Sequence, residues 1–330
     1  MSTRDPVDWT ARAERSNALA LGAMRRFALF FGRRLARLWL VPIVAWFVLG
    51  DAELRRHSRR YLARALGRAP TFGDVWRHVH AFASTVLDRV FLLDGRFDLF
   101  RISAVGRPEE ILDPFARGEG VLAIGAHVGS FEALRMVGHD KGLRVAMIMY
   151  EDNARLVNAA LAAIAPKATL VTIALGRVDA MLTLRRWLDE GGVAGMLGDR
   201  TLPGGDGARS RTVRVPFLGA PAPFADGPFR LAAMLRRKLV FMAGLYRSGN
   251  AYEMRFAELA DFTSLPPGPA ARDAAIREAL ERYVRTLESL CRDAPYNWFN
   301  FFDFWGEDAG DPQPQGAAAV VLDRVEEPGR

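Results

Sequence analysis

The feature that most constrains the fold is an alternation of short apolar runs with longer amphipathic segments, from about residue 103 onward. "VLAIGA" at 121–126 is short and apolar throughout, as a strand buried on both faces would be. "SFEALRMVGHDKG" at 130–142 follows with helical spacing. Further strands are expected at 144–150, 168–175, 192–199, 238–247 and 252–259, and further helices at 152–165, 178–191, 227–237 and 266–295. This alternation predicts an α/β domain with a central, largely parallel (mixed) sheet flanked by helices.

The first hundred residues have a different texture, with arginine-rich amphipathic segments such as "ELRRHSRRYLARALG" and few strand-like runs. The chain has 330 residues, half of them hydrophobic, which is enough for a large core. We therefore expect an N-terminal arginine-rich, membrane-associated helical region over 1–75 and the α/β domain over 76–305. The tail over 306–330 is rich in Gly, Pro, Asp and Ala and is expected to be disordered.

The net charge of +7 favours an anionic partner, such as nucleic acid, a phosphate-bearing substrate or an anionic membrane surface. A nucleic-acid binder would interleave basic residues with exposed aromatics or carry a binding motif, and the sequence has neither feature. The basic residues gather instead on both sides of the most apolar stretch, "LWLVPIVAWFVLG" at 38–50. They are Arg25, Arg26, Arg33, Arg34 and Arg37 before it, and Arg55, Arg56, Arg59, Arg60 and Arg64 after it. We expect no nucleic-acid partner.

The apolar stretch is short for a transmembrane span. Its 13 residues rise about 20 Å as a helix, against a hydrocarbon core of about 30 Å, and Pro42 would kink it. Trp39 and Trp46 among the aliphatic side chains are typical of helices that lie in a membrane interface. A buried core helix with solvated arginine flanks is the alternative, and a single spanning helix stays open if the arginines snorkel.

The stretch "GAHVGSFEALR" at 125–135 carries the candidate chemistry. His127 stands at the carboxyl end of the first expected strand, where active residues gather in open α/β sheets, and glycines on both sides suit a tight turn. If the turn curls back, the carboxylate of Glu132 reaches one imidazole nitrogen and makes the other more basic. Alternatively, Ser130 caps the helix, Glu132 complements the helix dipole and His127 is incidental. The residues alone leave both interpretations open.

"H-V-G-S-F-E" fits the H-x4-D/E signature of the glycerolipid and lysophospholipid acyltransferase superfamily. Within it, the chain most resembles the bacterial lipid A biosynthesis (lauroyl/myristoyl) acyltransferases. An arginine-rich aromatic N-terminal helix, the strand ending "GMLGDR" with its glycine-rich stretch and "VPFLGAPAPFADGPFRLA", and the closing "APYNWFNFFDFW" support this branch. The resemblance covers about residues 20–305. Four blocks in order are far more specific than the histidine motif alone.

The resemblance implies that His127 is the general base and Glu132 its orienting carboxylate. The base would take a proton from an acceptor hydroxyl, which attacks the carbonyl of an acyl thioester and expels a thiolate. No covalent acyl-enzyme is implied, because the sequence has no serine or cysteine in a nucleophile elbow.

The resemblance also implies substrate-binding roles for Asp199, Arg200 and Arg230. Asp199 keeps the first acidic position of the family's second block, but the second acidic position is not matched in "GDRTLPGGDG". Arg200 could pair with a substrate phosphate or with Asp199. Arg230 could contact a phosphate or be a solvated arginine, and these alternatives stay open.

Partners and location follow from the same resemblance. The donor is expected to be acyl carrier protein rather than coenzyme A, and the acceptor a lipid or glycolipid such as a lipid A precursor. The protein would lie at an anionic membrane surface, the cytoplasmic face of the bacterial inner membrane, as a monotopic or single-helix anchored enzyme. A thioester hydrolase, acylation of another acceptor (an aminolipid, a polyene or a different glycolipid) and a non-catalytic membrane-binding protein are the alternatives.

No cofactor and no metal are expected. His78 and His80 are two residues apart, which points them to different faces of a helix, and no Cys or acidic cluster accompanies them. The single cysteine, Cys291, excludes an internal disulfide and is expected to be a packed helix residue.

Overall fold

The computed structural model describes residues 22, 25–105, 117–140, 142–150, 171–175, 178–201 and 211–306. The predictions of a helix at 152–165 and of a disordered tail lie outside the described residues, apart from residue 306, the first of the tail.

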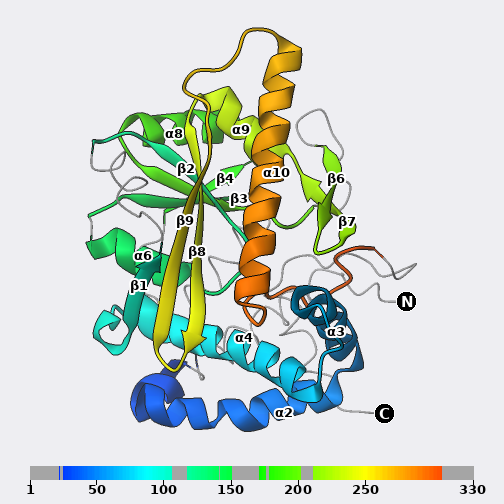
Figure 1. The fold of residues 1–330 in the computed structure, drawn as a ribbon. Coiled ribbons are helices and arrows are strands. Elements are labelled where there is room, and N and C mark those ends of the chain that lie inside the picture. Colours follow the sequence, from blue (N-terminus) through cyan, green and yellow to red (C-terminus); the bar gives the residue numbers. More distant parts are fainter. Residues whose placement is uncertain are drawn as a thin grey trace, which may run out of the picture.

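The core of the protein is a seven-stranded mixed sheet (Figure 1). Its spatial order is β1 (Arg101–Val105), β9 (Ala251–Asp261), β8 (Lys238–Ser248), β2 (Val121–Gly125), β5 (Val193–Leu197), β3 (Val145–Tyr150) and β4 (Val171–Leu175). Every neighbouring pair is parallel except β8 and β9, which form an antiparallel hairpin. The prediction of an α/β domain with a largely parallel, mixed sheet is confirmed.

Helices cover the sheet, as the alternating pattern predicts. They are α6 (Phe131–Asp140), α8 (Val178–Asp189), α9 (Gly227–Leu235) and α10 (Pro269–Asp293). In Figure 1 the long helix α10 runs beside β8 and β9. Its Tyr283 is fully buried and donates a hydrogen bond of 3.0 Å to the carbonyl oxygen of Gly125, at the end of β2. The helix is therefore fastened to the carboxyl end of the strand that precedes His127.

A second, two-stranded sheet was not expected from the sequence. β6 (Thr212–Phe217) and β7 (Ala220–Ala225) form an antiparallel hairpin whose turn residues, Leu218 and Gly219, both have positive φ. Prolines within both strands hide this hairpin from pattern recognition, because proline removes a ladder donor and is normally confined to edges. In a two-stranded sheet each strand has a free edge, so the prolines are tolerated.

The N-terminal part is helical, as predicted. Residues 25–38 form a helix, the chain turns at Trp39, and α2 (Leu40–Gly50), α3 (Ala52–Leu66) and α4 (Phe72–Leu93) follow. α2 packs along α4 at the end of the molecule where β8 and β9 are joined (Figure 1). α4 spans the boundary expected between residues 75 and 76, so the two regions share a helix; the division into domains stays a prediction.

α2 is apolar on all sides, and only one face of it packs against the protein. Leu40, Val44 and Val48 are buried, whereas Trp46 on the opposite face is 73% exposed. With the preceding helix, α2 forms an exposed hydrophobic surface that we call the outer apolar face. It comprises Phe30, Phe31, Leu35, Leu38, Trp39, Val41, Ile43, Trp46 and Leu49. None of the helices in the described ranges is both long and apolar enough to cross a membrane.

Arg33 and Arg37, from the basic cluster before the apolar stretch, bond other parts of the protein. Arg33 makes two hydrogen bonds of 2.7 and 2.8 Å to the buried carboxylate of Asp88, and Tyr252 donates a third. Arg37 donates to the hydroxyl of Tyr246 at 2.8 Å. A buried carboxylate needs a counter-charge, and Arg33 supplies it. Arg26 and Arg34 remain exposed.

Candidate active site

His127 and Asp199 meet at the carboxyl edge of the sheet. They follow β2 and β5, which are adjacent and parallel and pair Gly125 with Leu197. Residues two positions beyond each strand therefore lie side by side. The imidazole Nδ1 of His127 is 2.8 Å from Oδ1 of Asp199, and the backbone N–H of His127 donates to Oδ2 of the same carboxylate at 3.0 Å. Both oxygens of Asp199 are thus engaged with one residue.

The turn after His127 requires glycine, as the sequence indicated. Gly129 has a φ of +62°, and a Cβ atom there would lie 2.0 Å from the carbonyl oxygen of Gly244 in β8. The next residue, Ser130, donates its backbone N–H to that same carbonyl at 2.8 Å. The backbone of β8 therefore passes directly against the turn and fixes the position of His127.

The C-terminal aromatic block, residues 294–305, crosses this turn and completes the site. The backbone N–H of Phe299 donates to the carbonyl of His127 at 2.7 Å, and Gly129 donates to the carbonyl of Asn297 at 2.9 Å. Between them, the indole N–H of Trp298 donates to Oδ2 of Asp199 at 2.9 Å. The side-chain amide of Asn300 donates to the same oxygen at 3.2 Å. Sequentially distant segments thus converge on one buried carboxylate.

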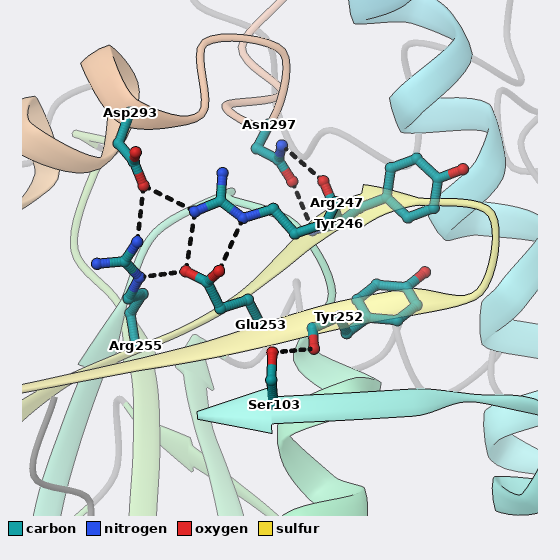
Figure 2. A network of polar contacts seen from close by, with 8 residues as sticks. All are labelled: Ser103, Tyr246, Arg247, Tyr252, Glu253, Arg255, Asp293 and Asn297. Atoms are coloured by element: carbon teal, nitrogen blue, oxygen red, sulfur yellow. Dashed lines mark hydrogen bonds and ion pairs between the residues drawn. The ribbon is translucent and has the colours of Figure 1, made fainter. Parts of the chain in front are cut away.

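A polar network holds this block in place (Figure 2). Asn297 pairs with the backbone of Tyr246, accepting from its N–H at 2.7 Å and donating to its carbonyl at 3.0 Å. Just before the block, Asp293 accepts a hydrogen bond of 2.7 Å from Arg247 and another of 2.7 Å from Arg255. Both arginines also bond Glu253 of β9 (Figure 2). The end of α10 is therefore tied to the β8–β9 hairpin.

His78, on α4, also bonds the backbone of the aromatic block. Its Nε2–H donates to the carbonyl of Trp298 at 2.8 Å, and its Nδ1 accepts from the hydroxyl of Ser58 at 2.8 Å. Burial lowers the pKa of His78 to about 4, so the ring is neutral, as this hydrogen-bond pattern requires. No group of three or more His, Cys, Asp or Glu side chains that could hold a metal occurs in the ranges that the structure describes.

The electrostatics of the site suit a general base. Burial alone would raise the pKa of Asp199, but the imidazole of His127 and the charge of Arg200 outweigh it, so the carboxylate stays ionised. Burial lowers the pKa of His127, Asp199 opposes this, and the positive charges of Arg200 and Arg89 add to the decrease. The neutral ring therefore keeps its proton on Nδ1, facing Asp199. Nε2 carries the lone pair and makes no hydrogen bond with a described residue, and the side chain is 24% exposed.

The structure corrects the expected role of Glu132. The carboxylate on the imidazole is that of Asp199, and Glu132 makes no hydrogen bond or ion pair with His127 among the described residues. α6 begins at Phe131, which turns Glu132 toward α4, where Arg89 lies 2.8 Å from its Oε1. Ser130 donates to its Oε2 at 3.2 Å and also caps α6 by accepting from Ala133 at 3.2 Å. The expected cap is confirmed.

Arg200 is placed beside the site, but it does not bond Asp199. Its Nε and Nη2 donate to the side-chain oxygen of Asn300 at 3.0 and 2.8 Å, and the guanidinium lies over the ring of Phe302. Burial lowers its pKa to about 10, so it remains a cation at neutral pH. Arg230 makes its ion pairs with other residues, Asp226 at 2.7 Å and Asp273 at 2.9 Å. The structure does not bring Arg230 into contact with His127.

Three residues of the site were missed from the sequence. Trp298 and Asn300 belong to the closing aromatic block, which supported the resemblance but was given no role in the site. The sequence signal that could have found them is an indole and an amide, both hydrogen-bond donors, within a run of aromatic residues. Arg89 has no signal at all, because a lone arginine on an amphipathic helix is ordinarily solvated. Its position is apparent only when α4 is packed against α6.

The arrangement is able to take a proton from a hydroxyl or from water at Nε2, with the resulting imidazolium stabilised by a buried carboxylate. Comparisons of the sequence with protein-family models and with curated proteins found no match.

Proposed function

We propose that the protein is an acyltransferase that moves a fatty acyl chain from an acyl thioester to a hydroxyl of a lipid or glycolipid. The observation that carries the proposal is the His127–Asp199 pair at the carboxyl ends of two parallel strands, in which Nε2 of the imidazole has no hydrogen-bond partner among the described residues. The resemblance of the blocks around His127 to lipid A biosynthesis acyltransferases names the substrates: acyl carrier protein as donor and a lipid A precursor or related glycolipid as acceptor.

In the proposed mechanism, Nε2 takes the proton of the acceptor hydroxyl as its oxygen attacks the thioester carbonyl carbon. The C–S bond of the tetrahedral intermediate then breaks, and the imidazolium returns the proton to the leaving thiolate. Asp199 holds the ring in the required tautomer and stabilises the imidazolium. Arg200, which Asn300 holds in place, supplies positive charge next to the reacting carbonyl.

We propose further that the outer apolar face rests in a membrane interface. Trp39 and Trp46 project from it, and amphipathic aromatic rings favour that depth. Arg26 and Arg34 are exposed on the same helical segment and would meet anionic head groups. This supports a monotopic enzyme, which we place at the cytoplasmic face of the bacterial inner membrane.

Product analysis tests the enzymatic proposal. The purified protein is incubated with a fatty acyl thioester of acyl carrier protein or of coenzyme A and with a bacterial lipid extract, and lipids are identified by mass spectrometry. We expect a new acylated lipid that is absent with His127→Ala. Free fatty acid without acylated lipid would show a thioester hydrolase instead. Full activity of the folded His127→Ala variant would refute the mechanism.

Vesicle flotation tests the membrane proposal. Trp46→Ser should weaken binding to vesicles that contain an anionic phospholipid, because an exposed aromatic anchor is lost. Met234→Ser is the matched control, since Met234 is also exposed but lies on α9, away from the outer apolar face. Equal flotation of the two variants and the wild type would contradict the proposed surface.

A further inference from the structure

Glu132 and Arg89 form a pair beside the active site that the proton transfer does not use. The carboxylate of Glu132 is buried, with 9% of its side chain exposed, and lies 2.8 Å from Nε of Arg89 on α4. The active site therefore contains two buried carboxylates with separate partners. Asp199 orients an imidazole, and Glu132 orients a guanidinium.

The geometry of the pair leaves most of the guanidinium available. Glu132 contacts Arg89 through Nε, and its other oxygen accepts from Ser130. The two terminal nitrogens of Arg89 make no hydrogen bond with any residue that the structure describes, and the side chain is 39% exposed. The buried carboxylate of Glu132 thus lies against Nε as an ion pair without a hydrogen bond, and the two terminal nitrogens are left for a ligand.

The charge around His127 is asymmetric. Asp199 and Glu132 are both buried and already engaged, so neither presents negative charge to a ligand. Arg89 and Arg200 are both close enough to His127 to lower the pKa of its imidazole. Arg200 is held by Asn300 and Phe299, whereas the side chain of Arg89 is partly exposed, so α4 brings an accessible guanidinium to this part of the protein.

Guanidinium groups match phosphate oxygens bidentately, and an arginine held by a carboxylate loses less entropy on binding because it is already oriented. We propose that Arg89 forms a phosphate-binding site near His127, that Arg200 adds positive charge from the segment after β5, and that Glu132 is the positioning residue of Arg89. This inference rests on the proposed acyltransfer function. The phosphate would belong either to the phosphopantetheine arm of the donor or to the head group of the acceptor lipid.

Binding without turnover tests the site. Isothermal titration with phosphopantetheine and, separately, with dihexanoyl phosphatidic acid measures the donor and acceptor arms. We expect Arg89→Gln to weaken at least one of them by tenfold or more. Arg77→Gln is the matched control, because Arg77 is an exposed arginine of the same helix that lies over Tyr296. It should bind as the wild type does.

Loss with phosphopantetheine alone assigns the site to the donor, and loss with the lipid alone assigns it to the acceptor. Glu132→Gln should raise KM for the same substrate with little change in kcat. The variant that carries both Arg89→Gln and Glu132→Gln should bind that ligand no more weakly than Arg89→Gln alone. Thermal denaturation verifies the fold, and Arg89→Lys, which keeps the charge but not the fork, should be intermediate.

Unchanged binding of both ligands by a folded Arg89→Gln protein would overturn the site while leaving the acyltransferase proposal standing. Conversely, Arg89-dependent phosphate binding by a wild-type protein that transfers no acyl group would keep the site and reject the proposed function.

Discussion

Replacing Asp199 by asparagine tests which of the two buried carboxylates, that of Asp199 or that of Glu132, supports the proposed base. The carboxylate is fully buried and 2.8 Å from Nδ1, so the charges of Asp199 and an imidazolium would be about 4 Å apart. At an effective dielectric constant of about 20, their attraction is about 4 kcal/mol. That interaction develops only as the imidazole takes its proton, and about 1.4 kcal/mol corresponds to a tenfold change in rate. We therefore expect kcat to fall by about a thousandfold.

The assay is steady-state acyl transfer at saturating donor and acceptor. Asparagine keeps one oxygen to accept from Trp298 or Asn300, so thermal denaturation should show a folded protein. Glu132→Gln is the matched control: it removes the same charge from a neighbouring buried carboxylate that does not touch the imidazole. Its kcat should stay within about tenfold of the wild type, which corresponds to a change of at most about 1.4 kcal/mol in the activation free energy.

Two results would refute this reasoning. A folded Asp199→Asn protein with kcat within tenfold of the wild type would remove Asp199 from the mechanism. A thousandfold loss of kcat in Glu132→Gln, with Asp199→Asn close to normal, would return the orienting role to Glu132 and require a different arrangement of the turn during catalysis.

Other perturbations have equally definite outcomes. Because burial holds the pKa of His127 below its ordinary value of about 6.5, and because only the neutral ring acts as a base, kcat/KM should fall only as the pH drops below about 6.5; an acid limb above that value would contradict this. Gly142→Ala, at a positive φ in open space, should cost about 1–2 kcal/mol in denaturant unfolding. Gly129→Ala should cost about 1–3 kcal/mol more, because its Cβ would meet β8; equal costs would refute the close approach. Trp298→Phe should lose about 1.5–3 kcal/mol of unfolding free energy, since a hydrogen bond to a charged Asp199 is lost. Its effect and that of Asp199→Asn should then be less than additive.

The strands and helices of the α/β domain were predictable because their signal is local. β2 is five residues of continuous apolar sequence that are buried in the structure, and the helices between strands show clear amphipathic spacing. Three prolines within the strands, Pro216, Pro221 and Pro223, defeated the same approach in the β6–β7 hairpin. There the pairing is set by geometry that ordinary strand preferences oppose.

The candidate site was predictable only in part. His127 could be placed at the end of a strand, and Asp199 at the end of another, from sequence alone. That these strands are neighbours is a matter of sheet order, which local patterns do not encode. Glu132 is close to His127 in sequence and was therefore favoured as its partner, whereas the true contact with Asp199 spans 72 positions. Sequence proximity favoured Glu132, whereas the structure places Asp199 against the imidazole.

The aromatic block (residues 294–305) crosses the turn at His127. The candidate site can therefore be disrupted while the rest of the fold stays intact. The backbone bonds that join Gly129 to Asn297 and Phe299 to His127 connect residues about 170 positions apart, and they lie at the carboxyl edge of the sheet, beside the fully buried Trp298. A sub-global opening that lifts this block would free Asp199 from Trp298 while β2, β5 and β8 stay paired. The amide protons of Gly129 and Phe299 should then exchange with solvent as one cooperative unit, at a free energy below that of the sheet. The protein could lose its proposed general base without losing its fold.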